Sequence, residues 1–70
     1  MMSLADFLRH LTKHGCKYKP LEGGNITGNA IEITNPANNK YYILAIYKGG
    51  MISDTTIKEI CLIRLFIPTP

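Results

Sequence analysis

The chain has 70 residues, enough for one small domain but too few for a doubly wound nucleotide-binding sheet, a barrel enzyme or a kinase lobe. Hydrophobic residues make up 46% of it and charged residues 19%, which is typical of a globular domain and not of a disordered segment. Eight Lys and Arg against five Asp and Glu give a net charge of +3, well below that of a dedicated nucleic-acid-binding protein. We therefore expect one domain over residues 1–70, with a small core that a partner or a second copy would help to stabilise.

An amphipathic helix is predicted over residues 3–14. Ser3, with Asp6 three positions later, is suited to cap its start, and Gly15 is suited to end it in a left-handed conformation. Large apolar side chains at i, i+3, i+4 and i+7 form the stripe that would face the core: Leu4, Phe7, Leu8 and Leu11.

Three strands are expected to follow, at residues 16–21, 26–34 and 41–47. Apolar and polar side chains alternate along the first two, and all three are separated by turn-forming residues at 22–25 and 35–39. We expect these strands to pair as antiparallel neighbours, because short turns connect them.

The strands differ in character. Pro20 makes the first an edge strand, because proline cannot donate to a ladder, and Gly28 predicts a bulge or a close backbone approach in the second. The third is apolar on both faces, with Tyr41, Ile43, Ala45 and Tyr47 on one and Tyr42, Leu44 and Ile46 on the other. Helices in a chain this short can cover only one face, so the other is a candidate contact surface.

A second helix is predicted to begin at Ser53 or Asp54, with Ile57, Ile60 and Cys61 on its apolar side. In residues 62–67, just before Pro68, apolar and polar side chains no longer separate onto two faces of a helix. This stretch fits either a last helical turn or an extended tail. The order of elements is then α-β-β-β-α. It predicts a two-layer α+β fold, with a three-stranded antiparallel sheet and both helices on one face.

Two cysteines, Cys16 and Cys61, are too few for the disulfide framework of a secreted mini-domain, and their apolar neighbours predict buried free thiols. His10 and His14 share a helix face near Cys16, but no further ligand completes the set, so we expect no metal and no cofactor. The N-terminus lacks a signal-peptide pattern, and the most apolar stretch, residues 60–67, is too short to span a bilayer. We expect a cytoplasmic protein that does not enter the membrane.

The candidate binding residues are cations of the first helix and strand together with aromatics of the third strand. The cations are Arg9, Lys13, Lys17 and Lys19. They form a candidate phosphate-contacting patch, although a solvated helix face that runs into an edge strand also accounts for them. Tyr41 and Tyr47 share a face and can stack on bases, or serve as ordinary core aromatics.

Five segments resemble, in their order and spacing, the HicA-type toxins, small mRNA interferases with a fold like that of double-stranded-RNA-binding domains. The segments are a helix end and strand start at residues 13–17, a glycine turn at 23–25, a hairpin at 35–36, a strand exit at 48–49 and a helix start at 56–60. The resemblance covers residues 4–62 and implies the α+β fold, RNA as a substrate and a HicB-type antitoxin as the partner.

The resemblance breaks at the catalytic histidine of the family, which follows Gly-Ser at the start of the second strand. The matching positions here are Gly23, Gly24 and Asn25. Asparagine can hydrogen-bond a phosphate or a base edge, but it exchanges no proton at accessible pH. Any catalytic histidine would have to be His10 or His14, although solvated helix side chains are the ordinary interpretation of both.

Three functions follow from these observations. The first is a HicA-like, non-catalytic module that binds RNA or a protein partner, with Asn25 among the contacting residues. The second is a toxin-type endoribonuclease that uses His10 or His14. The third is a homodimeric protein-interaction domain that associates through the uncovered face of the sheet.

Overall fold

The structure is a computed structural model that describes residues 1–21, 29–46 and 50–70. The predicted turn at 22–25, which includes Asn25, lies outside these residues. The bulge expected at Gly28 and the aromatic Tyr47 also lie outside them.

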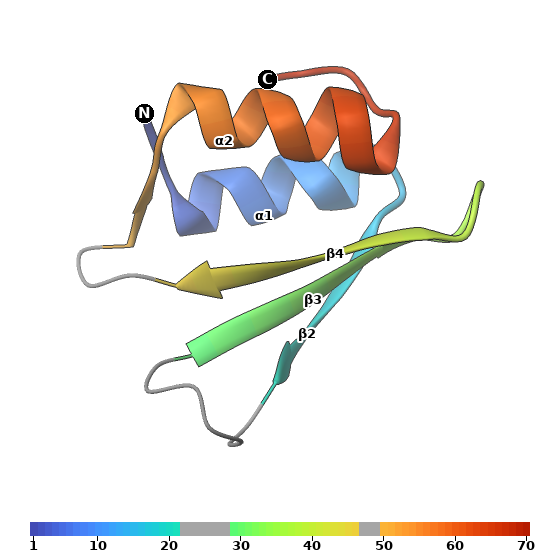
Figure 1. Cartoon of the computed structure of the whole chain (residues 1–70), viewed down its shortest axis with the longest axis horizontal. Helices are drawn as coiled ribbons and strands as arrows, with labels where there is room; N and C mark the ends of the chain where they lie inside the picture. Colours follow the sequence, from blue (N-terminus) through green and yellow to red (C-terminus); the bar gives the residue numbers. More distant parts are fainter. Residues whose placement is uncertain (22–28, 47–49) are drawn as a thin grey trace.

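The prediction of an α+β domain with a three-stranded antiparallel sheet and two helices is confirmed (Figure 1). The elements in chain order are β1 (Met2–Ser3), α1 (Leu4–Lys13), β2 (Lys17–Leu21), β3 (Asn29–Asn35), β4 (Lys40–Ile46), β5 (Met51–Ile52), α2 (Asp54–Lys58) and a π-helical continuation η1 (Glu59–Leu65). The short strands β1 and β5 pair in a separate two-stranded sheet, which the sequence analysis did not predict. None of the helices in the described part of the chain is both long and apolar enough to cross a membrane.

Helix α1 begins and ends where its local sequence indicates. The Ser3 hydroxyl accepts a hydrogen bond of 3.2 Å from the Asp6 backbone N–H, which is one of the donors that the first helical turn leaves unpaired. At the other end Gly15 has a φ of 82°, the left-handed conformation that glycine adopts without steric cost. The predicted helix over residues 3–14 is therefore one residue shorter at each end, with Ser3 and His14 as its caps.

The larger sheet has the order β2–β3–β4 and is antiparallel throughout. In its register, Ile33 lies between Tyr18 and Tyr42, and Ile31 lies between Pro20 and Leu44. Directly opposed residues of neighbouring strands share a face of the sheet. These six side chains therefore occupy one face, and their sequence neighbours occupy the other.

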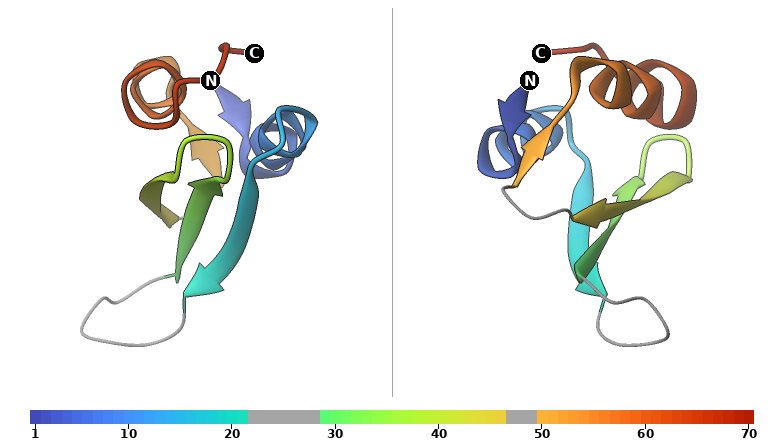
Figure 2. Two further views of the ribbon diagram at one scale, coloured as in Figure 1. Left: turned by 90° about the vertical axis from the view of Figure 1, so that its right-hand side faces the viewer. Right: turned by 60° about the vertical axis from the view of Figure 1, so that its left-hand side comes forward.

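The hydrophobic core fills the space between this face and the helices, which Figures 1 and 2 show on the same side of the sheet. Both helices and the two longest strands contribute buried side chains to one cluster. Its largest fully buried members are Phe7, Leu11, Ile33, Ile60, Leu65 and Cys61. Neither of the described helices lies over the opposite face of the sheet in Figures 1 and 2.

The C-terminal helix extends through Leu65, which decides between the two alternatives for residues 62–67 in favour of helix up to that point. Phe66 ends it with a φ of 56°, and the Ile67 N–H then bonds back to the Cys61 carbonyl at 2.8 Å. Where η1 faces the sheet, the Arg64 guanidinium lies 5.9 Å from the centre of the Tyr42 ring, which makes a cation–π contact between η1 and β4.

Candidate functional site

The uncovered face of the sheet carries two of the predicted cations and one of the predicted tyrosines. Strand alternation and register place its side chains in cross-strand rows. One row is Lys17, Thr34 and Tyr41, and the next is Lys19, Glu32 and Ile43. We call this surface the open face. Its far end is the row of Leu21, Ala30 and Ala45, in which Ala30 is buried.

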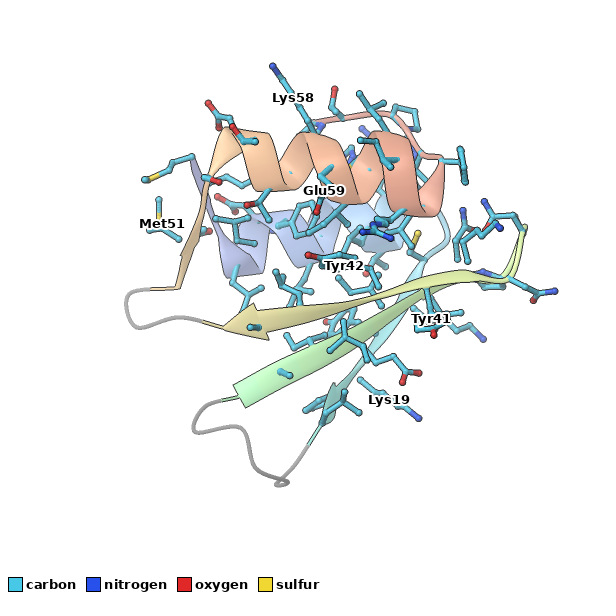
Figure 3. The ribbon with its side chains drawn as sticks, viewed as in Figure 1. Lys19, Tyr41, Tyr42, Met51, Lys58 and Glu59 are labelled. Carbon is cyan, nitrogen blue, oxygen red and sulfur yellow. The ribbon has the colours of Figure 1, made fainter. Side chains whose placement is uncertain are left out.

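Two large side chains of β4 on the open face are exposed to solvent. Tyr41 is 64% exposed and Ile43 is 48% exposed. In Figure 3, Lys19 and Tyr41 lie on the side of the sheet away from the helices, whereas Tyr42 lies on the helix side. The exposed ring of Tyr41 and the two lysines of β2 share one face of the sheet, two strands apart. An aromatic ring and cations on one face can contact the bases and the phosphates of a nucleic acid.

The charge of the open face is positive but partly compensated. The Lys19 Nζ lies 3.9 Å from the Glu32 Oε1, a pair that is exposed on the lysine side and so contributes little to stability. Lys17 makes no salt bridge with any described residue. The face therefore presents one uncompensated lysine, one lysine that a competing anion can take from Glu32, and one acidic group.

The other two predicted cations lie elsewhere. Arg9 and Lys13 belong to the solvent side of α1, where they line a shallow groove together with Tyr18 from the helix side of β2. Arg9 also pairs with the Asp6 carboxylate, and this hydrogen bond holds the pKa of Asp6 below its usual value. Because Tyr18 and Lys17 alternate along β2, the groove and the open face are on opposite sides of that strand.

The two histidines form a contact pair at the end of α1. Their ring centroids are 4.5 Å apart in an edge-to-face arrangement. His10 Nε2 lies 2.7 Å from the Pro68 carbonyl oxygen, and since a carbonyl only accepts, the ring donates this hydrogen bond. In this arrangement the two rings contact each other, and one nitrogen of His10 is engaged by the Pro68 carbonyl.

The thiols are buried and unpaired, as the sequence predicts. Burial raises the pKa of Cys16, and burial together with Cys16 raises the pKa of Cys61 to about 11. Both sulfurs are therefore protonated near neutral pH and are poor nucleophiles.

An apolar hollow of about 220 Å³ lies between the β1–β5 sheet, the start of α1 and the end of β4. Side chains of Leu4, Leu44, Met51 and Ile52 line it, and no charged side chain is among the described lining residues. Over residues 1–21, 29–46 and 50–70, no group of three His, Cys, Asp or Glu side chains is arranged to hold a metal ion.

The structure thus gathers Lys17, Lys19 and Tyr41 on one face and separates them from Arg9 and Lys13. Asn25 and Tyr47 lie outside the described residues. Three side chains were not among the predicted site residues: Tyr18, which lines the groove on α1, and Glu32 and Thr34, which lie on the open face. Alternation along residues 16–21 and 26–34 was the available signal for them, but the register that sets Thr34 opposite Tyr41 depends on the tertiary fold.

Comparison of the chain with known proteins found no matching family model, no matching curated protein and no matching solved structure. The resemblance to the HicA-type toxins remains a prediction from the five segments that carry it.

Proposed function

We propose that this chain is a small, non-catalytic RNA-binding module of two layers, in which both helices cover one face of the sheet and the open face binds single-stranded RNA. In this proposal Tyr41 stacks on a base, while Lys17 and Lys19 contact the phosphates on either side of it. The observation that carries the proposal is the row of Lys17, Thr34 and Tyr41, a cation and an exposed ring on one uncovered surface.

Binding of single-stranded RNA combines two interactions, base stacking and phosphate contact, and each has its own structural requirement. Stacking needs a ring face in contact with solvent, and the 64% exposure of Tyr41 supplies it. Phosphate contact needs cations near the ring, and Lys17 in the same cross-strand row supplies one. A base stacked on an aromatic side chain is worth about 1–3 kcal/mol, and each neutralised phosphate adds a salt-dependent contribution.

The proposed function is binding without cleavage, and the arrangement of the two histidines supports it. His10 and His14 contact each other, and His10 is bonded to the Pro68 carbonyl. The open face, for its part, carries no histidine among its described residues.

A gel-shift assay with labelled single-stranded and structured RNA, repeated across a salt series, tests this function. We expect a shift with single-stranded RNA that weakens as salt rises. Tyr41→Ala should lower the affinity about 5- to 150-fold, the equivalent of one lost stack, whereas Tyr41→Phe should bind like the native chain. Replacing Lys17 and Lys19 by alanine should flatten the slope of log affinity against log salt by about 1.4.

Two matched variants sharpen the test. Glu32→Gln removes the acidic group of the open face and should tighten binding, a direction that a merely structural role would not produce. Lys58→Ala removes an exposed lysine of α2 on the far side of the molecule and should leave the affinity unchanged (Figure 3).

Three results would overturn the proposal. The first is RNA binding that is lost when Arg9 and Lys13 are both replaced by alanine but kept when Lys17 and Lys19 are. This result would move the site to the groove on α1. Cleaved RNA, abolished by His10→Ala with His14→Ala, would restore the endoribonuclease interpretation. Absence of any shift at micromolar protein would favour a protein partner.

A further inference from the structure

Strand β4 has an outer edge that no described element covers. The strand runs over seven residues and pairs with β3 along its whole length. In the described part of the chain it pairs with no second strand, and no backbone hydrogen bond from a loop reaches residues 41–46. Figure 2 shows β4 at the margin of the sheet. Its outward N–H and C=O groups are therefore available to another strand.

The opposite margin of the sheet is protected against such pairing. The outer strand there is β2, in which Pro20 lacks an N–H and both Lys17 and Lys19 carry charge. Prolines and lysines on edge strands are the devices by which proteins prevent strand addition. From Tyr41 to Ile46, β4 has none of them, since every residue is apolar or aromatic. One margin is blocked and the other is open.

We propose that β4 pairs with β4 of a second copy of this chain, in antiparallel orientation, and joins two three-stranded sheets into one of six strands. The charge on the strand selects this orientation. Lys40 at its start is the only charged residue of β4. Antiparallel pairing places the two copies of Lys40 at opposite ends of the interface, whereas parallel pairing would set them side by side, where like charges repel. This inference does not rest on the proposed RNA binding.

The side chains along β4 suit pairing about a two-fold axis near Ile43. In that register Ile43 opposes its own counterpart, Tyr41 opposes the small Ala45, and Tyr42 opposes Leu44. In this register residues of the open face oppose residues of the open face, so the open faces of both copies lie on one side of the joined sheet. Aromatic side chains opposite aliphatic or small ones are favourable cross-strand neighbours.

The C-terminal helix adds contact area beside the strand. Figure 3 shows Glu59 and Tyr42 on the same side of the molecule, above β4. Ile63 follows Glu59 by four residues, which places it on the same side of the helix, and it is 64% exposed. Stable interfaces bury about 800 Å² per partner, so side chains beside the strand are needed in addition to the strand itself.

Sedimentation equilibrium on the RNA-free chain tests the proposal. The native chain should form a dimer at micromolar to millimolar concentration. Ile43→Lys and Ile43→Glu should each be folded, because this side chain is half exposed, and each should be monomeric, because two like charges would meet at the axis. An equimolar mixture of the two variants should recover the dimer, since opposite charges then meet. Tyr18→Lys, a matched change on the blocked margin, should remain dimeric.

Disulfide trapping gives a second readout that needs only a mild substitution. Ile43→Cys should cross-link to its counterpart under oxidising conditions, because opposed side chains of antiparallel strands are about 4.5–5.5 Å apart at Cβ. The native thiols are buried and should not contribute. A monomeric native chain would overturn the proposal. So would a dimer that survives Ile43→Lys, a mixture of charge variants that stays monomeric, or a Tyr18→Lys variant that dissociates.

Discussion

The Leu65 carbonyl at the end of the C-terminal helix accepts two side-chain hydrogen bonds from the β3–β4 hairpin. The Asn35 Nδ2 donates at 2.8 Å and the Asn38 Nδ2 at 3.0 Å. Asn35 is 4% exposed, and its Oδ1 also accepts from the Ala37 N–H at 3.1 Å, so both ends of its amide are satisfied. Two asparagines that look like ordinary turn formers in the sequence therefore hold a helix 27 to 30 residues away.

We predict that Asn35→Ala lowers the free energy of unfolding by about 2 kcal/mol, because it removes a buried hydrogen bond to the Leu65 carbonyl and a part-buried one from the Ala37 N–H. Asn38→Ala removes a bond at a more exposed position and should cost less than about 1 kcal/mol. Urea unfolding followed by circular dichroism measures both. Equal costs for the two variants would contradict this account.

At the scale of elements, local sequence signals define the helix ends. The Ser53 hydroxyl accepts from the Thr56 N–H at 3.3 Å and donates to the Thr56 hydroxyl at 2.9 Å, so it caps α2 as Ser3 caps α1. The same signals could not predict the β1–β5 sheet. A two-residue strand is too short to show an alternation of apolar and polar side chains. Met2 pairs with Ile52 only because the tertiary fold brings these two distant residues together.

Ser53→Ala should therefore lower the free energy of unfolding by about 1 kcal/mol, the usual value of a lost N-cap. Ser53→Asp should retain most of the stability, because a carboxylate accepts the same hydrogen bond and also favours the positive end of the helix dipole. Thr55→Ala is the matched control, since Thr55 is exposed and makes no side-chain cap. Thermal unfolding of the three variants distinguishes them, and a loss as large in Thr55→Ala as in Ser53→Ala would refute the capping role.

At the scale of the whole molecule, a chain of this size buries a limited core, and association is an accessible way to add stability. If β4 joins two copies, dissociation is coupled to unfolding. The midpoint of thermal unfolding should then rise with protein concentration for the native chain and stay constant for Ile43→Lys. Calorimetry at two concentrations a hundredfold apart measures this, and a midpoint independent of concentration in both would count against the dimer.

The candidate site was only partly accessible to sequence reasoning. Alternation along the third strand correctly put Tyr41 with Ile43. Sequence analysis grouped Arg9 and Lys13 with Lys17 and Lys19, but the structure places the two pairs on different surfaces. Proximity along the chain does not specify the side of the sheet on which a side chain lies. Glu32, the acidic group that compensates Lys19, belongs to the site only through strand register.

The sequence by itself determined the α+β class, the caps of α1, the alternating faces of the strands and the burial of both thiols. These are properties of spacing and of single side chains, whose preferences act over one turn or one strand. Only the tertiary structure decided that Tyr41 and Lys17 share an uncovered face, that Asn35 holds the end of η1 and that the margin at β4 is open. Those features join residues distant in the chain, and register, packing and the side on which helices lie have no local signature.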